Sequence, residues 1–174
     1  MRFLLAHHSA SSNSYTEAGV PGLIRGFYGF HTGPDKRWPD VAYSFFVDKF
    51  GGVWEGRTGS TAKPVAGSAT GGNQGYTRLC CLIGDYSATT PTESQQASLV
   101  KLLATLADWH GIDTAPGAQT TFVSKGSNKH PRGTQVTTRT IEGHRSMSTT
   151  SCPGDSAYAL VPGLQARVTK LRAG

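Results

Sequence analysis

An imidazole and a thiol, His144 and Cys152, lie in an irregular stretch near the C-terminal end of this chain. The step from 144 to 152 is too long for one helical turn or for a zinc-finger knuckle, so a loop must fold both side chains inward. Imidazole nitrogen and thiolate sulfur are preferred zinc ligands. The pattern therefore predicts a metal site whose remaining protein ligand comes from elsewhere in the fold.

The start of the chain supplies a candidate for that ligand. The apolar run at residues 3–6 predicts a buried strand, and His7 and His8 follow it directly. Neighbouring side chains on a strand point to opposite faces, so only one of these imidazoles can share an ion with His144 and Cys152. Two imidazoles and one thiolate would leave zinc an open fourth position, which is typical of catalytic rather than structural sites.

Length and composition narrow the class of protein. A chain of 174 residues needs no second domain to bury a core, so we expect a single domain over residues 1–174. The net charge of +6 predicts attraction to polyanions, but the 17 Lys and Arg are scattered, and no nucleic-acid signature is present. We expect no nucleic-acid partner. No apolar run is long enough for a membrane span, and the apolar opening is too short for a signal peptide.

Periodicity and turn signals predict the remaining elements. We expect helices over residues 20–30, from the Thr90-Pro91-Thr92-Glu93 capping signals to about 109, and from 155 to about 171 with an interruption at Pro162. Residues 41–48 and 53–55 predict a hairpin, and 79–83 predict a central strand in which Cys80 and Cys81 are core residues. Residues 58–76 and 111–138 are expected to be loops, the first bordering a binding groove and the second carrying a solvated charged stretch at 125–132.

Several pieces of the sequence occur in a familiar order across nearly the whole chain. They are Ala-His-His-Ser-Ala at 6–10, Asp-Val-Ala-Tyr-Ser-Phe-Phe-Val-Asp at 40–48, Val-Trp-Glu-Gly-Arg at 53–57, and residues 143–155. Together they resemble peptidoglycan-recognition-protein domains and the related type 2 N-acetylmuramoyl-L-alanine amidases, with residues 143–168 most similar to actinobacterial and actinophage members, including endolysins. The resemblance implies an α/β fold with a mixed central β-sheet flanked by helices.

The resemblance also implies an activity and its residues. Such a protein would be a zinc hydrolase that cleaves the amide bond between N-acetylmuramic acid and L-alanine in peptidoglycan, with Zn²⁺ held by His7, His144 and Cys152. Tyr43 falls at the tyrosine position of the family's similar segment, which implies a hydroxyl beside the zinc. Thr150 matches a position that carries threonine or lysine in the family, where it would orient the scissile carbonyl.

Substrate contacts are implied less directly. The family pattern makes His31 a groove residue, and Arg57 and Arg78 are candidates for contacts to a stem-peptide carboxylate. Thr58-Gly59 follow the Glu-Gly-Arg motif where many recognition proteins have Gly-Trp, so the choice between diaminopimelate and lysine stays open.

The resemblance leaves two functions to weigh. The alternative to the amidase is a peptidoglycan-binding module without activity, whose family members typically lack the ligand cysteine; Cys152 therefore favours the enzyme. We expect a monomer that acts on the cell wall in an extracellular or periplasmic location, reached through a segment not present here or through lysis. The acidic polymers of a bacterial wall would satisfy the chain's positive charge.

Overall fold

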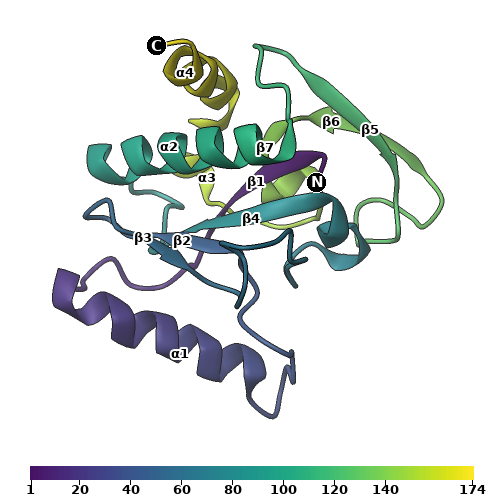
Figure 1. The fold of residues 1–174 in the computed structure, drawn as a ribbon. Helices are drawn as coiled ribbons and strands as arrows, with labels where there is room; N and C mark the ends of the chain where they lie inside the picture. The colour runs from purple at the N-terminus through teal and green to yellow at the C-terminus, as the bar shows by residue number, and fades with distance from the viewer.

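A five-stranded sheet in the order β3-β2-β4-β1-β7 forms the centre of the fold, and the computed structural model describes residues 1–174 (Figure 1). Strand β1 pairs in parallel with β4 and β7, β2 pairs in parallel with β4, and β2 and β3 form an antiparallel hairpin. The mixed sheet, the hairpin and the central strand are thereby confirmed. The strands span β1 Phe3–His8, β2 Phe45–Val47, β3 Val53–Glu55, β4 Thr77–Leu82 and β7 Ile141–Gly143.

Helices cover both faces of this sheet (Figure 1). Helices α2 (Glu93–His110) and α4 (Val161–Ala173) pack on one face around buried side chains of β1, β2 and β4. Helix α1 (Val20–Thr32) lies on the other face against a smaller cluster that includes Phe46 and Cys81. None of the helices combines the length and the apolar character that crossing a bilayer requires. The remaining helical segments are short: η1 Glu17–Gly19, η2 Gly71–Tyr76, η3 His144–Ser146 and α3 Asp155–Tyr158.

The ends of two helices differ from the sequence expectation. Helix α2 is capped by Thr92, whose hydroxyl accepts a hydrogen bond from the Gln95 N–H at 3.1 Å, and not by Thr90. The expected last helix is divided into α3 and α4, and Pro162 lies in the first turn of α4. A proline is tolerated there because the first N–H groups of a helix have no intrahelical acceptor. The interruption therefore precedes the proline.

A two-stranded antiparallel ribbon, β5 (Gln119–Val123) with β6 (Gln135–Arg139), occupies a region that the sequence predicted as loop. That prediction was wrong because the strands bury few side chains, chiefly Phe122 and Val136, and are otherwise polar and rich in threonine. Phe122 stacks on Phe3 of β1 with ring centroids 5.3 Å apart. The ribbon therefore covers part of the sheet face that also carries α1.

Arg78 lies on β4 with its side chain on the face covered by α2, where its guanidinium sits over the Phe45 ring at 5.3 Å. The side chain is fully buried and donates to the main-chain carbonyls of Lys63, at 2.9 Å, and of Ser60. Strand alternation places it on the face opposite Leu79, so the expected contact with a substrate carboxylate is corrected. Arg78 instead ties the 58–68 loop to the sheet.

We expect Arg78→Ala to lower the free energy of unfolding by about 3 to 5 kcal/mol, because it removes a large buried side chain and leaves carbonyl groups without donors. Chemical denaturation measures this loss. Arg139→Ala, on the exposed side of β6, is the control and should change stability by less than about 0.5 kcal/mol. An Arg78→Ala protein as stable as the unaltered chain would contradict this structural role.

Candidate metal centre

The parallel pairing of β1 with β7 brings the two histidines together. Ala6 lies opposite Gly143 in that register, so the next residues, His7 and His144, emerge side by side at the carboxyl ends of the two strands. Their ring centroids are 4.3 Å apart. Residues far apart in sequence are thus adjacent because parallel strands end at the same edge of the sheet.

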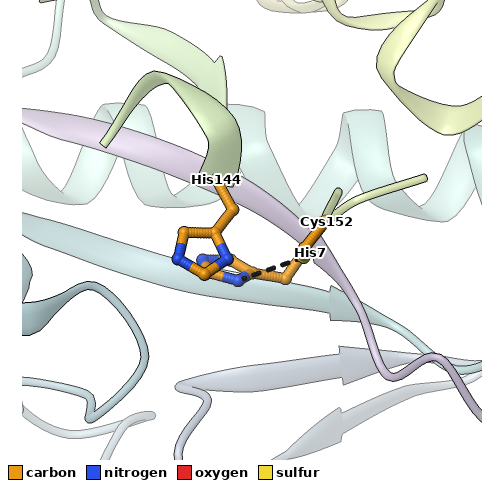
Figure 2. A group of neighbouring side chains, drawn as sticks. All are labelled: His7, His144 and Cys152. Carbon is orange, nitrogen blue, oxygen red and sulfur yellow. Dashed lines mark hydrogen bonds between the residues drawn. The ribbon is translucent and has the colours of Figure 1, made fainter. Parts of the chain in front are cut away.

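Cys152 reaches the same point from the loop that follows η3. Figure 2 shows its side chain converging with the two imidazoles, with Cys152 Sγ 3.7 Å from His7 Nδ1. The sulfur also accepts a hydrogen bond from the His8 main-chain N–H at 3.4 Å. Gly154 returns the loop with a φ of +86°, and a Cβ there would lie 2.3 Å from the main chain of Tyr86, so only glycine fits.

The three side chains have the spacing of a metal site, and several of their ring nitrogens have no hydrogen-bond partner. Their ligand atoms all lie within 4.8 Å of one another. His7 Nε2 and both ring nitrogens of His144 are buried without a hydrogen-bond partner, which is rare for buried polar atoms. Tetrahedral zinc with ordinary bond lengths implies a nitrogen-to-sulfur separation of about 3.6 Å, close to the observed one. The donor set therefore fits zinc.

Burial sets the protonation of these groups. It lowers the pKa of His7 well below its usual value, with His144 and His8 adding to the effect, and it lowers the pKa of His144 to about 4. Both imidazoles are therefore neutral near pH 7, as metal ligation requires. Burial raises the pKa of the Cys152 thiol to about 12, against the opposing influence of the His8 N–H and Arg145. A bound cation would favour the thiolate again.

The alternative between His7 and His8 is resolved by strand alternation. The His8 side chain points to the opposite face, where its Nδ1 accepts a hydrogen bond from the Tyr86 N–H at 3.2 Å and lies 3.8 Å from Asp85. It therefore cannot share an ion with His144. Only the main chain of His8 contributes to the centre, through its N–H to Cys152.

Tyr43 lies beside the centre, with its ring centroid 5.4 Å from that of His7. The sequence predicted a strand over residues 41–48 that would include Tyr43. In the structure β2 begins only at Phe45, so Tyr43 precedes the strand. Burial, together with the neighbouring thiols of Cys81 and Cys152, raises its pKa well above the usual value. The hydroxyl therefore stays protonated and can donate a hydrogen bond.

His31 and Arg57 support the Tyr43 segment from inside. His31 is buried; its Nδ1 accepts from the Ala42 N–H at 3.3 Å, and its ring packs edge-on against Tyr43 at 5.9 Å. Arg57 is also buried and donates to the Val41 carbonyl at 3.0 Å and to the carbonyl of Ala66. Both side chains therefore support the fold beside the site, and their contacts with a substrate groove and a substrate carboxylate stay predictions.

A pocket of about 420 Å³ opens beside His144. Thr150 lines it, is exposed, and accepts a hydrogen bond from the Cys152 N–H through its hydroxyl at 3.2 Å. The 58–76 segment borders this pocket, as expected. Sequence reasoning missed most of the lining, which comes from three separate segments and consists of small or uncharged polar residues: Ala69, Gly71, Ser127, Asn128, Ser148 and Thr149.

Arg145 fixes the other side of the ligand loop and was not singled out as a site residue from the sequence. Its guanidinium pairs with Asp155 at 2.9 Å, donates to the Ser151 carbonyl and lies 4.5 Å over the Tyr158 ring. The arginine immediately after His144 therefore links this loop to α3. Its adjacency to a candidate ligand was the only sequence signal.

The metal-free protein should lose stability as the pH falls from 6.5 to about 4. The pKa of His144 is lowered from 6.5 to about 4 in the fold, so the unfolded chain binds more protons in this window, and folding is disfavoured by up to about 3 kcal/mol at its acidic end. Urea denaturation in the presence of a chelator measures the slope. His144→Gln should reduce the slope and leave the part that the lowered pKa of His7 contributes, and an unchanged slope in that variant would assign the effect to other groups.

Comparison with known proteins places this arrangement in a family. A family model described as N-acetylmuramoyl-L-alanine amidase matches residues 1–155. Peptidoglycan-recognition protein SC2 of Drosophila simulans is 25% identical over 158 residues, covering 91% of this chain and 71% of that protein. The protein of the same name from Drosophila melanogaster matches with the same identity and coverage.

Solved structures with the same fold include both recognition proteins and an amidase. Drosophila peptidoglycan recognition protein SD has a TM-score of 0.70 at 19% identity, covering 92% of this chain and 79% of that chain. The N-acetylmuramoyl-L-alanine amidase LysC from Clostridium intestinale has a TM-score of 0.68 at 17% identity, covering 97% and 85%. A complex of tracheal cytotoxin with the ectodomains of recognition proteins LCa and LCx has a TM-score of 0.69 at 19% identity, covering 92% and 80%.

At these identities the structures agree in fold alone, with the mixed sheet and its flanking helices. The sequence match is the more specific finding, because it spans residues 1–155 of the 174 in the chain. The chain therefore belongs to the N-acetylmuramoyl-L-alanine amidase family.

Proposed function

We propose that this protein is a zinc-dependent N-acetylmuramoyl-L-alanine amidase that hydrolyses the amide bond between N-acetylmuramic acid and L-alanine in bacterial peptidoglycan. The convergence of His7, His144 and Cys152, with His144 also lining an open pocket, carries this proposal. Three protein ligands beside an accessible pocket correspond to a catalytic zinc site, whereas a structural site would be closed by a fourth.

The residues around the centre fit amide hydrolysis. A zinc ion held there would act as a Lewis acid toward the amide carbonyl and would acidify water. The Tyr43 hydroxyl, kept protonated by burial, can donate a hydrogen bond where negative charge develops on the carbonyl oxygen. Thr150 lines the pocket with a hydroxyl that can orient the carbonyl, but it cannot supply a cation.

A binding module without activity is the second candidate. The relatives named as recognition proteins favour it, because the solved ones share this fold and one of those structures, that of LCa and LCx, contains bound tracheal cytotoxin. The complete ligand set, with a cysteine at 152, favours the enzyme. Incubation of the purified protein with peptidoglycan, with and without a chelator, separates the two, because only the enzyme releases stem peptides.

The site of action follows from the substrate. We propose that the protein acts on the cell wall, in an extracellular or periplasmic location, and as a monomer. The net charge of +6 supports adsorption to anionic wall polymers, and this attraction between exposed charges is screened over about 8 to 10 Å at physiological salt.

We expect Cys152→Ser to bind zinc much more weakly, because the hydroxyl that replaces the thiol is a poor zinc ligand at neutral pH. Metal analysis after dialysis should show strongly reduced zinc in this variant and about one zinc per chain in the unaltered protein. Cys80→Ala is the control, since Cys80 is buried on the opposite face of the sheet. Full zinc occupancy in Cys152→Ser would refute the ligand assignment.

We expect Tyr43→Phe to keep the fold and the zinc but to lower turnover by about 10² to 10³, the usual effect of removing one hydrogen-bond donor to a developing oxyanion. Release of stem peptides from peptidoglycan gives the rate. Tyr15→Phe is the matched control, because the Tyr15 hydroxyl bonds to the Ile83 carbonyl at 3.1 Å, away from the centre. Unchanged turnover by zinc-loaded Tyr43→Phe would leave Tyr43 as a packing residue only.

A further inference from the structure

The connection between β5 and β6, residues 124–134, lies against the loop that carries the candidate ligands. The Ser127 hydroxyl donates to the Met147 carbonyl at 2.9 Å, and His130 Nε2 lies 2.8 Å from the Ser146 carbonyl. Lys129 donates through Nζ to the Arg145 carbonyl at 2.5 Å. The stretch predicted to be solvated is therefore a contact surface for the segment between His144 and Cys152.

Asn128 makes the most specific of these contacts. Its carboxamide oxygen accepts from the Thr149 N–H at 2.9 Å, and its carboxamide nitrogen donates to the Thr149 carbonyl at 3.2 Å. The pairing resembles the hydrogen bonding between two neighbouring strands. It provides hydrogen-bond partners for both the N–H and the carbonyl of Thr149. Thr149 and Thr150 are exposed and bury no apolar side chain that could hold them in place. The carboxamide therefore supplies the hydrogen bonds that hold the main chain of Thr149, between Met147, which is buried, and Cys152.

The contact between Asn128 and Thr149 can hold the ligand loop in place because the 124–134 connection is itself fixed to the sheet. Asn73, a buried residue of η2, accepts hydrogen bonds through its carboxamide oxygen from the Lys125 N–H at 2.9 Å and from the Ser124 hydroxyl at 3.2 Å. Gly72 donates to the Gly126 carbonyl at 2.6 Å, and a Cβ at Gly72 would lie 2.5 Å from the Lys125 carbonyl oxygen. Segment η2 leads directly into the central strand β4.

We propose that Asn128 is a positioning residue that holds the 149–152 segment so that Cys152 stays directed at the metal and Thr150 at the pocket. This inference rests on the proposed zinc site. Asn128 also lines the pocket beside His144. The same side chain therefore forms part of the pocket wall and holds the loop that carries Cys152. Groups that orient metal ligands from behind typically change metal affinity or activity by about 10- to 100-fold when they are removed.

The test measures zinc affinity of the full chain by competition with a chromogenic chelator. We expect Asn128→Ala and the similarly shaped Asn128→Leu each to bind zinc about 10-fold more weakly. Hydrogen exchange in the metal-free protein should also be faster at the Thr149 amide, a readout that does not depend on activity. Turnover at saturating substrate should fall with zinc occupancy, and excess zinc should restore the part of the loss that is due to lower occupancy.

The chain contains a matched control. The Asn13 carboxamide pairs in the same way with the main chain of Asp85, accepting from its N–H at 2.9 Å and donating to its carbonyl at 2.9 Å. Asn13→Ala removes the same two kinds of hydrogen bond at a half-buried position but should leave zinc affinity within about 2-fold of the unaltered chain. It therefore separates a loss of general stability from a loss of ligand positioning.

The outcomes are distinct. Wild-type zinc affinity and wild-type Thr149 exchange in both Asn128 variants would overturn the positioning role, whatever the activity. An equal loss of affinity in Asn13→Ala would overturn it as well, because the effect would then be one of stability. If the Asn128 variants lose affinity while the unaltered protein releases no stem peptides, the positioning role stands and the proposed amidase function fails.

Discussion

The parallel alignment of β1 between β4 and β7 is the constraint on which the rest of the site depends. It places the carboxyl ends of β1 and β7 at one edge of the sheet, so that His7 and His144 meet although they are separated by most of the chain. Parallel strands buried on both faces give this edge a rigid, dry base. A slip of one residue would turn His7 to the opposite face and remove the site.

Burial prepares the donors for a metal in two opposing ways. It keeps both imidazoles neutral, which leaves their nitrogens free to bind a cation near neutral pH. The same burial disfavours the Cys152 thiolate, and the His8 N–H that points at the sulfur and the nearby Arg145 offset this only in part. A divalent ion would complete this compensation, because its charge stabilises the thiolate more than burial destabilises it.

Two of the positive charges in the chain are buried and present little surface to a binding partner. Arg57 and Arg78 contribute to the net charge of +6, yet each donates to main-chain carbonyls inside the fold and presents little surface to a partner. They fasten the 58–68 loop, which borders the Tyr43 segment and leads toward the pocket. The pocket itself is lined by hydroxyl, amide and small side chains besides His144, so contacts there are made by neutral polar groups.

The sequence by itself determined the local patterns: the strand that ends in His7, the 79–83 strand, the capped helix at α2, and a histidine and a cysteine spaced for one loop. These follow from periodicity and capping, which depend on neighbours along the chain. Only the tertiary structure decided that His7 rather than His8 faces His144, and that His31, Arg57 and Arg78 are enclosed. It also decided that Asn128, in the connection between β5 and β6, forms hydrogen bonds with the main chain of Thr149. Such contacts join segments distant in sequence through strand register and side-chain packing, and no local pattern encodes the partner that a polar group will find.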